Sequence, residues 1–318
     1  MLFQSIELTT VGIDIGSSTS HLMFSRLHLQ RLGQFLSSRY VVVNREALYR
    51  SEILLTPYRP DYTIDADSLG NFIANAYQQA GLTHDDIDSG AIILTGEAIK
   101  RSNARAIADL FATQAGKFVC ASAGHNLECI LAANGSGGVA LSRDPVQTVL
   151  NIDIGGGTSK FALINNGKVL ETAAINVGGR LVALDADRKV IRVEHAAHMV
   201  ADSLGINLKI DEVLSKEDEV KIADRLAECL FELANRQKLT PLAQALMLTP
   251  ELTLDLPVDV VTFSGGVSEY IYERENTDYG DLALALAAGV RERINAGRLP
   301  GPMKSTDRKS TRLNSSHT

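Results

Sequence analysis

Residues 13–20 read IDIGSSTS and residues 152–159 read IDIGGGTS, so six of eight positions agree between two distant stretches of the chain. In both, an apolar, β-branched run stops at glycine, which is typical of a buried strand that enters a tight turn. An extended pattern resumes after each turn, at 21–29 and at 159–164. The sequence therefore predicts the same strand–turn–strand hairpin twice, and with it two related halves of the chain.

The patterns around the two hairpins predict alternating strands and helices in each half. The hairpin of the second half continues through the Asn166-Gly167 turn, a pair typical of tight β-hairpins. This alternation predicts an α/β fold with internal duplication, in which residues 1–147 form a first lobe and residues 148–303 a second lobe. Further strands are expected at 90–96, 117–124, 169–176 and 256–266, and helices at 68–81, 97–116, 125–137, 215–235 and 281–294.

Length and composition agree with two folded domains and exclude several classes of protein. The chain has 318 residues, of which 45% are hydrophobic and 22% charged. A net charge of −7 argues against a broad nucleic-acid surface. No apolar run reaches the roughly 18 residues of a membrane helix, and the first ten residues lack the features of a signal peptide. Cys120, Cys129 and Cys229 lack metal-ligand spacing and are expected to be buried thiols.

The end of the chain differs in kind from the rest. Residues 304–318 read KSTDRKSTRLNSSHT, a polar and aperiodic stretch with one apolar residue. It resembles the translated read-through of a sequencing adapter. We therefore expect residues 304–318 to be a disordered, non-native tail outside the fold.

The repeated turn has the chemistry to bind a nucleoside triphosphate with Mg²⁺. Glycines let backbone N–H groups approach phosphate oxygens closely, and Mg²⁺ takes only one or two carboxylates. We expect Asp14 and Asp153 to face one cleft as catalytic residues and metal ligands. A purely structural turn is the alternative for each copy, and the repetition favours binding. The expected phosphate donors are Gly16, Ser17, Ser18 and Thr19 in the first turn, and Gly155, Gly156, Gly157 and Thr158 in the second.

A third glycine turn follows the apolar run at 260–263, where the chain reads Ser264-Gly265-Gly266. Without side chains on two successive residues, a flat ring system can lie against the backbone, as an adenine site requires. An ordinary strand-to-helix turn is the alternative interpretation. Together with the two repeated turns, the residues Ser264, Gly265 and Gly266 complete the expected nucleotide site.

IDIGSSTS, IDIGGGTS and TFSGGVSE, in this order, resemble the two phosphate motifs and the adenosine motif of the actin/Hsp70/sugar-kinase ATPase superfamily. Over residues 2–298 the chain is similar to the ethanolamine ammonia-lyase reactivating factor family. The resemblance implies a two-lobed actin-like (ribonuclease H-like) fold. The stretches that carry the family resemblance are 11–27, 88–105, 119–137, 149–169, 175–181, 241–247 and 278–290.

This family resemblance implies an ATP- and Mg²⁺-dependent, chaperone-like factor. Its partner would be the adenosylcobalamin-dependent ethanolamine ammonia-lyase, in which it exchanges damaged cobalamin for intact cofactor, and ATP hydrolysis would serve that exchange. Members of the family continue well beyond the helix expected at 281–294. The second lobe is therefore expected to be incomplete, and reactivation by the 318-residue form is expected to be weak.

Two glutamates are candidates for orienting an attacking water. Glutamates in similar positions do so in related phosphatases, so the resemblance implies this role for Glu97 and Glu128, and a solvated helix face is the alternative for each. Lys160 follows the second phosphate turn, where a lysine at a strand edge is favoured over a phosphate contact. The run Gly178-Gly179-Arg180 is expected to line the cleft, because it follows the hairpin that leaves that turn.

Three other functions stay open within the same superfamily. They are a small-molecule kinase, an actin-like filament or membrane-associated protein, and a polyphosphatase-like hydrolase. No aspartate base for a kinase can be singled out, and no amphipathic anchor is present in the sequence. We expect a cytoplasmic protein with no nucleic-acid or membrane partner. The resemblance leaves room for a homo-oligomer and for association with a bacterial microcompartment.

Overall fold

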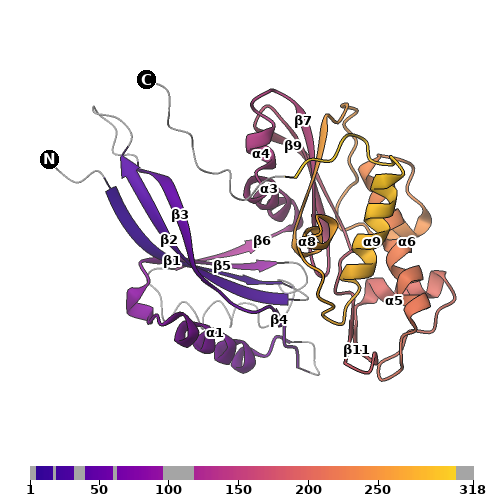
Figure 1. Ribbon diagram of the computed structural model, residues 1–318, viewed down its shortest axis with the longest axis horizontal. Helices are drawn as coiled ribbons and strands as arrows, with labels where there is room; N and C mark the ends of the chain where they lie inside the picture. Colours follow the sequence, from indigo (N-terminus) through magenta and orange to yellow (C-terminus); the bar gives the residue numbers. More distant parts are fainter. Residues whose placement is uncertain (1–4, 17–18, 32–39, 60–62, 96–117, 306–318) are drawn as a thin grey trace. The chain divides into compact units, whose positions relative to one another are not determined.

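The computed structural model describes residues 5–16, 19–31, 40–59, 63–95 and 118–305 (Figure 1). Two compact units divide the chain between Ala123 and Gly124. Unit 1 is the part before this boundary and unit 2 the part from Gly124 to Arg308. The boundary expected at residue 147 follows the sequence repeat, whereas packing groups residues 124–147 with unit 2. The helix expected at 97–116 lies outside the described residues.

Unit 1 contains one mixed sheet with the strand order β3-β2-β1-β5-β6, and β4 pairs with β2. β1 is antiparallel to β2 and parallel to β5, so the hairpin and its crossover strand share the central strand. Helix α1 lies along one face of this sheet (Figure 1). The elements are β1 (Ser5–Ile15), β2 (Thr19–Arg31), β3 (Tyr40–Arg50), β4 (Leu54–Leu55), α1 (Ala66–Ala80), the 3₁₀ helix η1 (His84–Asp86), β5 (Ser89–Thr95) and β6 (Phe118–Ala123).

The core of unit 1 lies between α1 and the sheet. Val11, Ile13 and Ile15 alternate along β1 and are buried, together with Leu69 and Ile73 of α1. This alternation is the strand period of two, and the spacing in α1 is that of one helix face. Burial of each of these aliphatic side chains stabilises the fold by about 1.5–3 kcal/mol. The core therefore holds β1, and with it the first glycine turn, at a defined depth in the unit.

Unit 2 repeats the arrangement of unit 1 in its central sheet, whose order is β12-β7-β8-β9. β7 is antiparallel to β8 and parallel to β12, as β1 is to β2 and β5. The predicted α/β fold with internal duplication is thereby confirmed. The strands are β7 (Thr148–Ile154), β8 (Ser159–Asn165), β9 (Lys168–Ile175), β12 (Val260–Ser264) and, in a separate hairpin, β10 (Val182–Leu184) and β11 (Val190–Val193).

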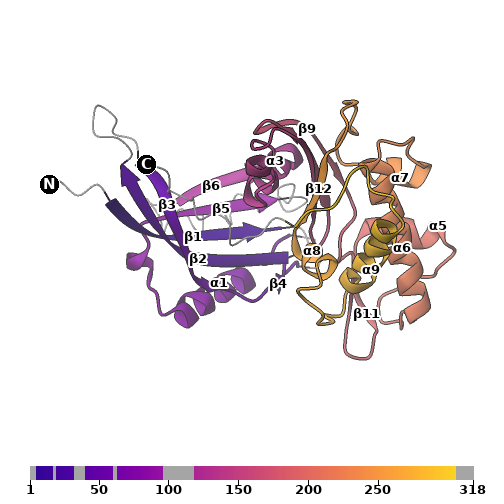
Figure 2. The same cartoon turned by 45° about the horizontal axis from the view of Figure 1, so that its top comes forward.

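The two faces of this sheet are covered by different helices. α3 packs on β8 and β9 on one face, and the large core with α6 and α9 lies on the other (Figure 2). Among the described residues, no helix combines the length and apolar character needed to cross a bilayer. The helices are α3 (His125–Gly135), α4 (Gly138–Leu141), α5 (His195–Ser203), α6 (Lys216–Ala234), α7 (Pro241–Leu246), α8 (Gly266–Ile271) and α9 (Ala283–Asn295).

A short segment lies along the outer edge of β12. The N–H of Val261 donates to the carbonyl of Pro302, and the N–H of Lys304 donates to the carbonyl of Val261, both at 2.9 Å. Met303 thus pairs with Val261 in parallel. In unit 1 the equivalent place beside β5 is taken by Phe118 of β6. Lys304, the first residue of the tail expected to be disordered, therefore takes part in the sheet, and residues 306–318 lie outside the described part of the chain.

A charged cluster joins α6 to α9. Arg298 donates two hydrogen bonds to the carboxylate of Glu228, at 2.7 and 2.9 Å. Arg293, whose side chain is 9% exposed, donates to Glu228 at 2.9 Å and to Asp224 at 2.6 Å. The hydrogen bonds from Arg298, together with those from Arg293, outweigh burial and lower the pKa of Glu228 to about 2. The ionised carboxylate is therefore part of the folded state at neutral pH.

Replacement of Glu228 by Gln is expected to lower the free energy of unfolding by about 2 kcal/mol at pH 7, because two guanidinium groups lose their charged acceptor. The folded-state pKa lies below the ordinary glutamate value, so this contribution is complete above pH 4.5 and is lost as the pH falls toward 2. Urea unfolding of wild type and Glu228→Gln at several pH values measures the difference. Glu217→Gln, at an exposed site on the same helix, is the control and should change stability little. A wild type–variant difference that does not shrink in acid would contradict the assignment.

Candidate functional site

The second glycine turn joins β7 to β8 at the end of the central sheet of unit 2. The N–H of Gly155 donates to the carbonyl of Thr158 at 3.0 Å, and Ile154 pairs with Ser159 as the new strand begins. The N–H of Gly155 is therefore used to close the turn and is not free to bind a ligand. Gly156, Gly157 and Thr158 form the remainder of the loop, where the sequence predicts phosphate donors.

Asp153 stands at the carboxyl end of β7, beside β12. Ser264 donates from its hydroxyl to one carboxylate oxygen of Asp153 at 2.6 Å. Asn151 donates from its amide to the same hydroxyl at 3.2 Å and accepts from the hydroxyl of Thr262 at 2.9 Å. A ladder of polar side chains therefore runs across the two parallel strands and orients the carboxylate. The half-buried position of Asp153 leaves it accessible at this edge.

A cavity of about 260 Å³ opens at this point of unit 2. It brings together three residues predicted from the sequence, Asp153, Ser264 and Gly265. The cavity has both a carboxylate and an aromatic ring on its wall, which is a suitable lining for a polar ligand with a flat part. Sequence reasoning missed most of the lining, because α3, α8 and the residues after α8 meet here only in the folded chain. These further residues are Ala132, Gly135, Ser136, Phe263, Ser268, Glu269, Tyr272 and Arg274.

The two glycines after Ser264 differ in their surroundings. Gly265 has a φ of +83° and a ψ of 175°, a region that is almost closed to other residues. A Cβ there would overlap with the carbonyl of Ile154. At Gly266 no atom lies within 4 Å of the position that a Cβ would take. The lack of room for a Cβ is enough to explain why position 265 is a glycine. Next to Gly266 there is open space for a ligand.

The loop after β9 packs directly against the second glycine turn. The N–H of Gly179 donates to the carbonyl of Gly155 at 3.0 Å, and the N–H of Arg180 donates to the carbonyl of Gly156 at 2.6 Å. A Cβ on Gly178 would overlap with the backbone of Gly156. That Gly178–Arg180 lines a cleft between the lobes stays a prediction. The structure shows that this run packs against the second glycine turn.

Glu128 is buried on α3 and forms an ion pair with Lys160 of β8. Its carboxylate lies 2.7 Å from the ammonium group, and the side chains are 7% and 14% exposed. A solvated helix face was the alternative expected for Glu128, and it is wrong. Lys160 is likewise not at an edge, because β8 has a neighbour on each side. It stands directly opposite Asp153 in the β7–β8 ladder, which places both side chains on the face that α3 covers.

Two cysteines of unit 2 are free and buried, as expected. Cys129 follows Glu128 on α3, and burial raises the pKa of its thiol to about 12. Burial also raises the pKa of Cys229 to about 12. Both thiols therefore stay protonated at neutral pH and act as small apolar groups rather than nucleophiles. The side chain of Cys120 lies outside the described atoms.

The first glycine turn, in unit 1, is closed by the same hydrogen bond. The N–H of Gly16 donates to the carbonyl of Thr19 at 2.9 Å, and Ile15 pairs with Ser20. Here a threonine far along the chain supports the turn, because the hydroxyl of Thr56 donates to the carbonyl of Gly16 at 2.8 Å. Ser20 shares a hydrogen bond of 2.9 Å with the same hydroxyl. The sequence offered no signal for Thr56.

The remaining predicted residues are placed in part. Asp14 is half-buried at the end of β1 and pairs with His21 across the hairpin, the place that Lys160 takes opposite Asp153. Ser17, Ser18 and Glu97 lie outside the described residues. That Asp14 and Asp153 face one cleft stays a prediction. Within the part of the chain that the structure describes, no three histidine, cysteine, aspartate or glutamate side chains gather as a metal cluster.

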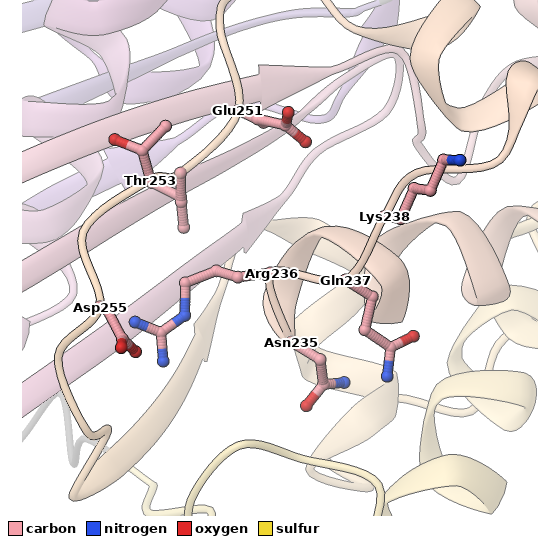
Figure 3. A pocket seen from close by; sticks show the side chains of 8 residues that line it. Asn235, Arg236, Gln237, Lys238, Glu251, Thr253 and Asp255 are labelled. Carbon is pink, nitrogen blue, oxygen red and sulfur yellow. The ribbon is translucent and has the colours of Figure 1, made fainter.

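A second cavity of unit 2, of about 470 Å³, lies after α6 and is lined by no residue of the glycine turns (Figure 3). Arg236 and Asp255 lie together at one side of it and Lys238 at the other (Figure 3). Arg236 has a φ of +52° and donates from its guanidinium to the carbonyl of Leu256 at 2.8 Å. Its charge is thus used to hold the loop after α7. The cavity contains none of the residues predicted from the sequence.

Gly265→Ala and Gly266→Ala separate packing from ligand space. We expect Gly265→Ala to lower the free energy of unfolding by at least ~3 kcal/mol, because it combines an unfavourable φ with an overlap. Gly266→Ala should leave stability nearly unchanged, since its Cβ enters open space. Urea unfolding of both variants measures this contrast. Equal losses in the two would contradict the different surroundings of these two glycines.

Comparison with known proteins agrees with the family resemblance of the sequence. The chain is 38% identical over 290 residues to the ethanolamine ammonia-lyase reactivase EutA of Salmonella typhimurium, and 37% identical over 290 residues to that of Escherichia coli. Each alignment covers 90% of this chain and 62% of the relative. The chain thus spans about 62% of the length of these curated relatives.

The solved structures that match the chain share little sequence with it. The Aquifex aeolicus PPX-GPPA enzyme has a TM-score of 0.49 at 12% identity, covering 91% of this chain and 93% of its own. The ethanolamine utilization protein EutJ from Carboxydothermus hydrogenoformans has a TM-score of 0.42 at 15% identity, covering 90% and 89%.

The family model described as "Ethanolamine utilisation protein EutA" matches residues 6–303, almost the whole chain. With this match and the two relatives above, the chain belongs to the EutA family of ethanolamine utilisation proteins.

Proposed function

We propose that this protein is an ATP- and Mg²⁺-dependent reactivating factor for adenosylcobalamin-dependent ethanolamine ammonia-lyase. It would promote the exchange of damaged cobalamin for intact cofactor. The observation that carries the proposal is family membership: the relatives named as ethanolamine ammonia-lyase reactivases align with 90% of this chain. The two glycine turns, each closed by the same hydrogen bond, would supply the nucleotide chemistry that such a factor needs.

The residues of unit 2 fit a magnesium nucleotide. Mg²⁺ keeps most of its waters and takes one or two carboxylates. A single carboxylate at a strand end, such as that of Asp153, is therefore a more suitable magnesium ligand than a closed cluster of side chains would be. Ser264 holds that carboxylate in place. We assign the N–H groups of Gly156, Gly157 and Thr158 to phosphate oxygens, and the space beside Gly266 to the adenine ring. When bound, Mg²⁺ would neutralise charge that develops on the phosphates.

In unit 1 the proposal assigns matching roles to the first turn. Asp14 would approach the metal from the other side, and Gly16, Ser17, Ser18 and Thr19 would donate to the phosphates. Glu128 and Glu97 are the candidates for orienting the attacking water. Support for Glu128 comes from its ion pair with Lys160, which holds the buried carboxylate in place on the same sheet face as Asp153.

ATP binding would act on the lyase through movement of the two units. A nucleotide held by both turns favours one relative angle of the units, and a protein bound across them experiences a change of that angle as strain. Such strain would loosen the partner so that a large, tightly held cofactor can leave. The proposal places this protein in the cytoplasm, with association with a microcompartment and self-association as further proposals.

The roles of the two aspartates are tested by Asp14→Asn and Asp153→Asn. Each removes one charge without a change of volume, and we expect ATP hydrolysis to fall on the order of 10²-fold at fixed Mg²⁺. Asp255→Asn removes the same charge at the cavity after α6 and serves as the matched control. Steady-state phosphate release from the three variants and wild type gives the answer. Hydrolysis that is unchanged in both Asp14→Asn and Asp153→Asn would show that the turns are structural.

The function is tested with ethanolamine ammonia-lyase that has been blocked with cyanocobalamin. We expect any restoration of lyase turnover by this chain, weak or full, to require ATP, Mg²⁺ and free adenosylcobalamin together. The Salmonella typhimurium reactivase is the positive control, and omission of each component in turn is the negative one.

Reactivation of the lyase without nucleotide would contradict the proposed ATP-dependent mechanism. Phosphorylation of a small alcohol by ATP would instead place the protein among the kinases. Release of phosphate from polyphosphate, with no effect on the lyase, would place it among the hydrolases.

A further inference from the structure

The loop Gly178–Arg180 determines how the peptide groups of the second glycine turn are oriented. In a trans peptide the carbonyl and the following N–H point in opposite directions. The carbonyl of Gly155 is bonded to the N–H of Gly179, so the N–H of Gly156 is directed away from this loop. The carbonyl of Gly156 is bonded to the N–H of Arg180, so the N–H of Gly157 is directed away as well.

Such fixation matters because the turn consists of glycines. Three successive glycines have more accessible backbone conformations than any other tripeptide, so their peptide groups can rotate at little steric cost. Preorganised donors stabilise developing charge because they need no reorganisation when the ligand arrives. A loop that fixes the two carbonyls from behind would therefore decide how well the two N–H groups bind phosphate.

The loop is itself held by a buried ion pair. Arg180 donates from Nε to one carboxylate oxygen of Asp281 at 2.8 Å, and the side chains are 16% and 6% exposed. The other carboxylate oxygen accepts from the N–H of Ala283 at 2.9 Å, at the start of α9. The N–H of Leu282 donates in turn to the carbonyl of Gly179 at 2.8 Å. Arg180 and the backbone of its loop are thus fastened to the beginning of α9.

Space around the loop is filled on its other sides too. A Cβ on Gly179 would lie 2.9 Å from both Ala283 and Val267. Val267 belongs to α8, which begins at Gly266 beside the cavity with Asp153. The loop therefore lies between the glycine turn, the start of α8 and the start of α9. A change in its position would be felt at the turn, since no empty space separates them.

We propose that Arg180 and Asp281 are a positioning pair for the nucleotide, which through the loop Gly178–Arg180 aims the N–H groups of Gly156 and Gly157 at the β- and γ-phosphates. Neither side chain touches the ligand. This inference rests on the proposed nucleotide binding by the second turn, and it adds two residues for which the motif itself gives no role. Loss of the pair should therefore weaken binding most for ligands whose phosphates contact the turn, and little for ligands that lack those phosphates.

The test compares Mg-ATP with AMP, which lacks the β- and γ-phosphates. We expect Arg180→Ala and Asp281→Asn to weaken Mg-ATP binding about tenfold, and AMP binding by less than twofold. Arg180→Lys keeps the charge and should restore part of the Mg-ATP affinity. Isothermal titration calorimetry measures both ligands. Glu219→Gln, which removes another buried carboxylate paired to an arginine, is the control and should alter neither affinity.

Hydrogen exchange in the nucleotide-free protein gives a second readout that does not depend on ligand binding. Peptides that cover residues 154–158 should exchange faster in Arg180→Ala and Asp281→Asn than in wild type. Their exchange rate should be unchanged in Glu219→Gln. Circular dichroism verifies that each variant is folded, and Asp281→Asn is the milder change if Arg180→Ala unfolds the protein.

Four results would overturn the inference. Equal losses of Mg-ATP and AMP affinity would mean that the pair is only structural. If wild type binds Mg-ATP and the variants Arg180→Ala and Asp281→Asn bind it equally well, the positioning role alone is refuted. If wild type binds no nucleotide, the proposed nucleotide site fails together with this inference, whereas unchanged exchange at 154–158 refutes the mechanical role of the loop in every case.

Discussion

Contact between backbones, without intervening side chains, is the constraint on which the candidate site of unit 2 depends. The end of β7 is held on one side by the turn at Gly265, which packs on Ile154, and on the other by Gly178, which packs on Gly156. Neither contact leaves room for a Cβ. Asp153 directly precedes the first of these contacts, and Ser264 fixes its carboxylate from the neighbouring strand. The position of the carboxylate therefore follows from the packing of main chain against main chain.

The two halves of the chain use the same hairpin with different supports. In both, a glycine N–H closes the turn onto a threonine carbonyl, and the strand register is the same. In unit 1 the hydroxyl of Thr56 supports the glycine carbonyl. In unit 2 backbone N–H groups of another loop do so. A side-chain hydroxyl fixes one atom, whereas a buried loop fixes a peptide plane. The two turns are closed by the same hydrogen bond and differ in the groups that support it.

Local chemistry was enough to predict the parts of the fold that depend on neighbouring residues. Apolar periodicity and glycine positions located the hairpins, and their repetition predicted two related halves of the chain. Asp153, Ser264 and Gly265 were also found in this way, because each lies at the end of a strand. Arg180 and Asp281, 101 residues apart, could not be paired from the sequence, since their contact is set by tertiary packing. The same holds for Lys160, which buries Glu128 although the helix pattern alone allowed a solvated face.

Adjacent glycines with unlike surroundings have a consequence for how natural variation in this protein should be interpreted. Gly265 would be retained by selection for folding even in a descendant that had lost every activity, because no other residue fits its backbone. Gly266 has no such protection, so drift would replace it soon after loss of the ligand. In a survey of diverged sequences, invariance at Gly265 would therefore carry no information about function. Invariance at Gly266 would be a record of selection on ligand binding.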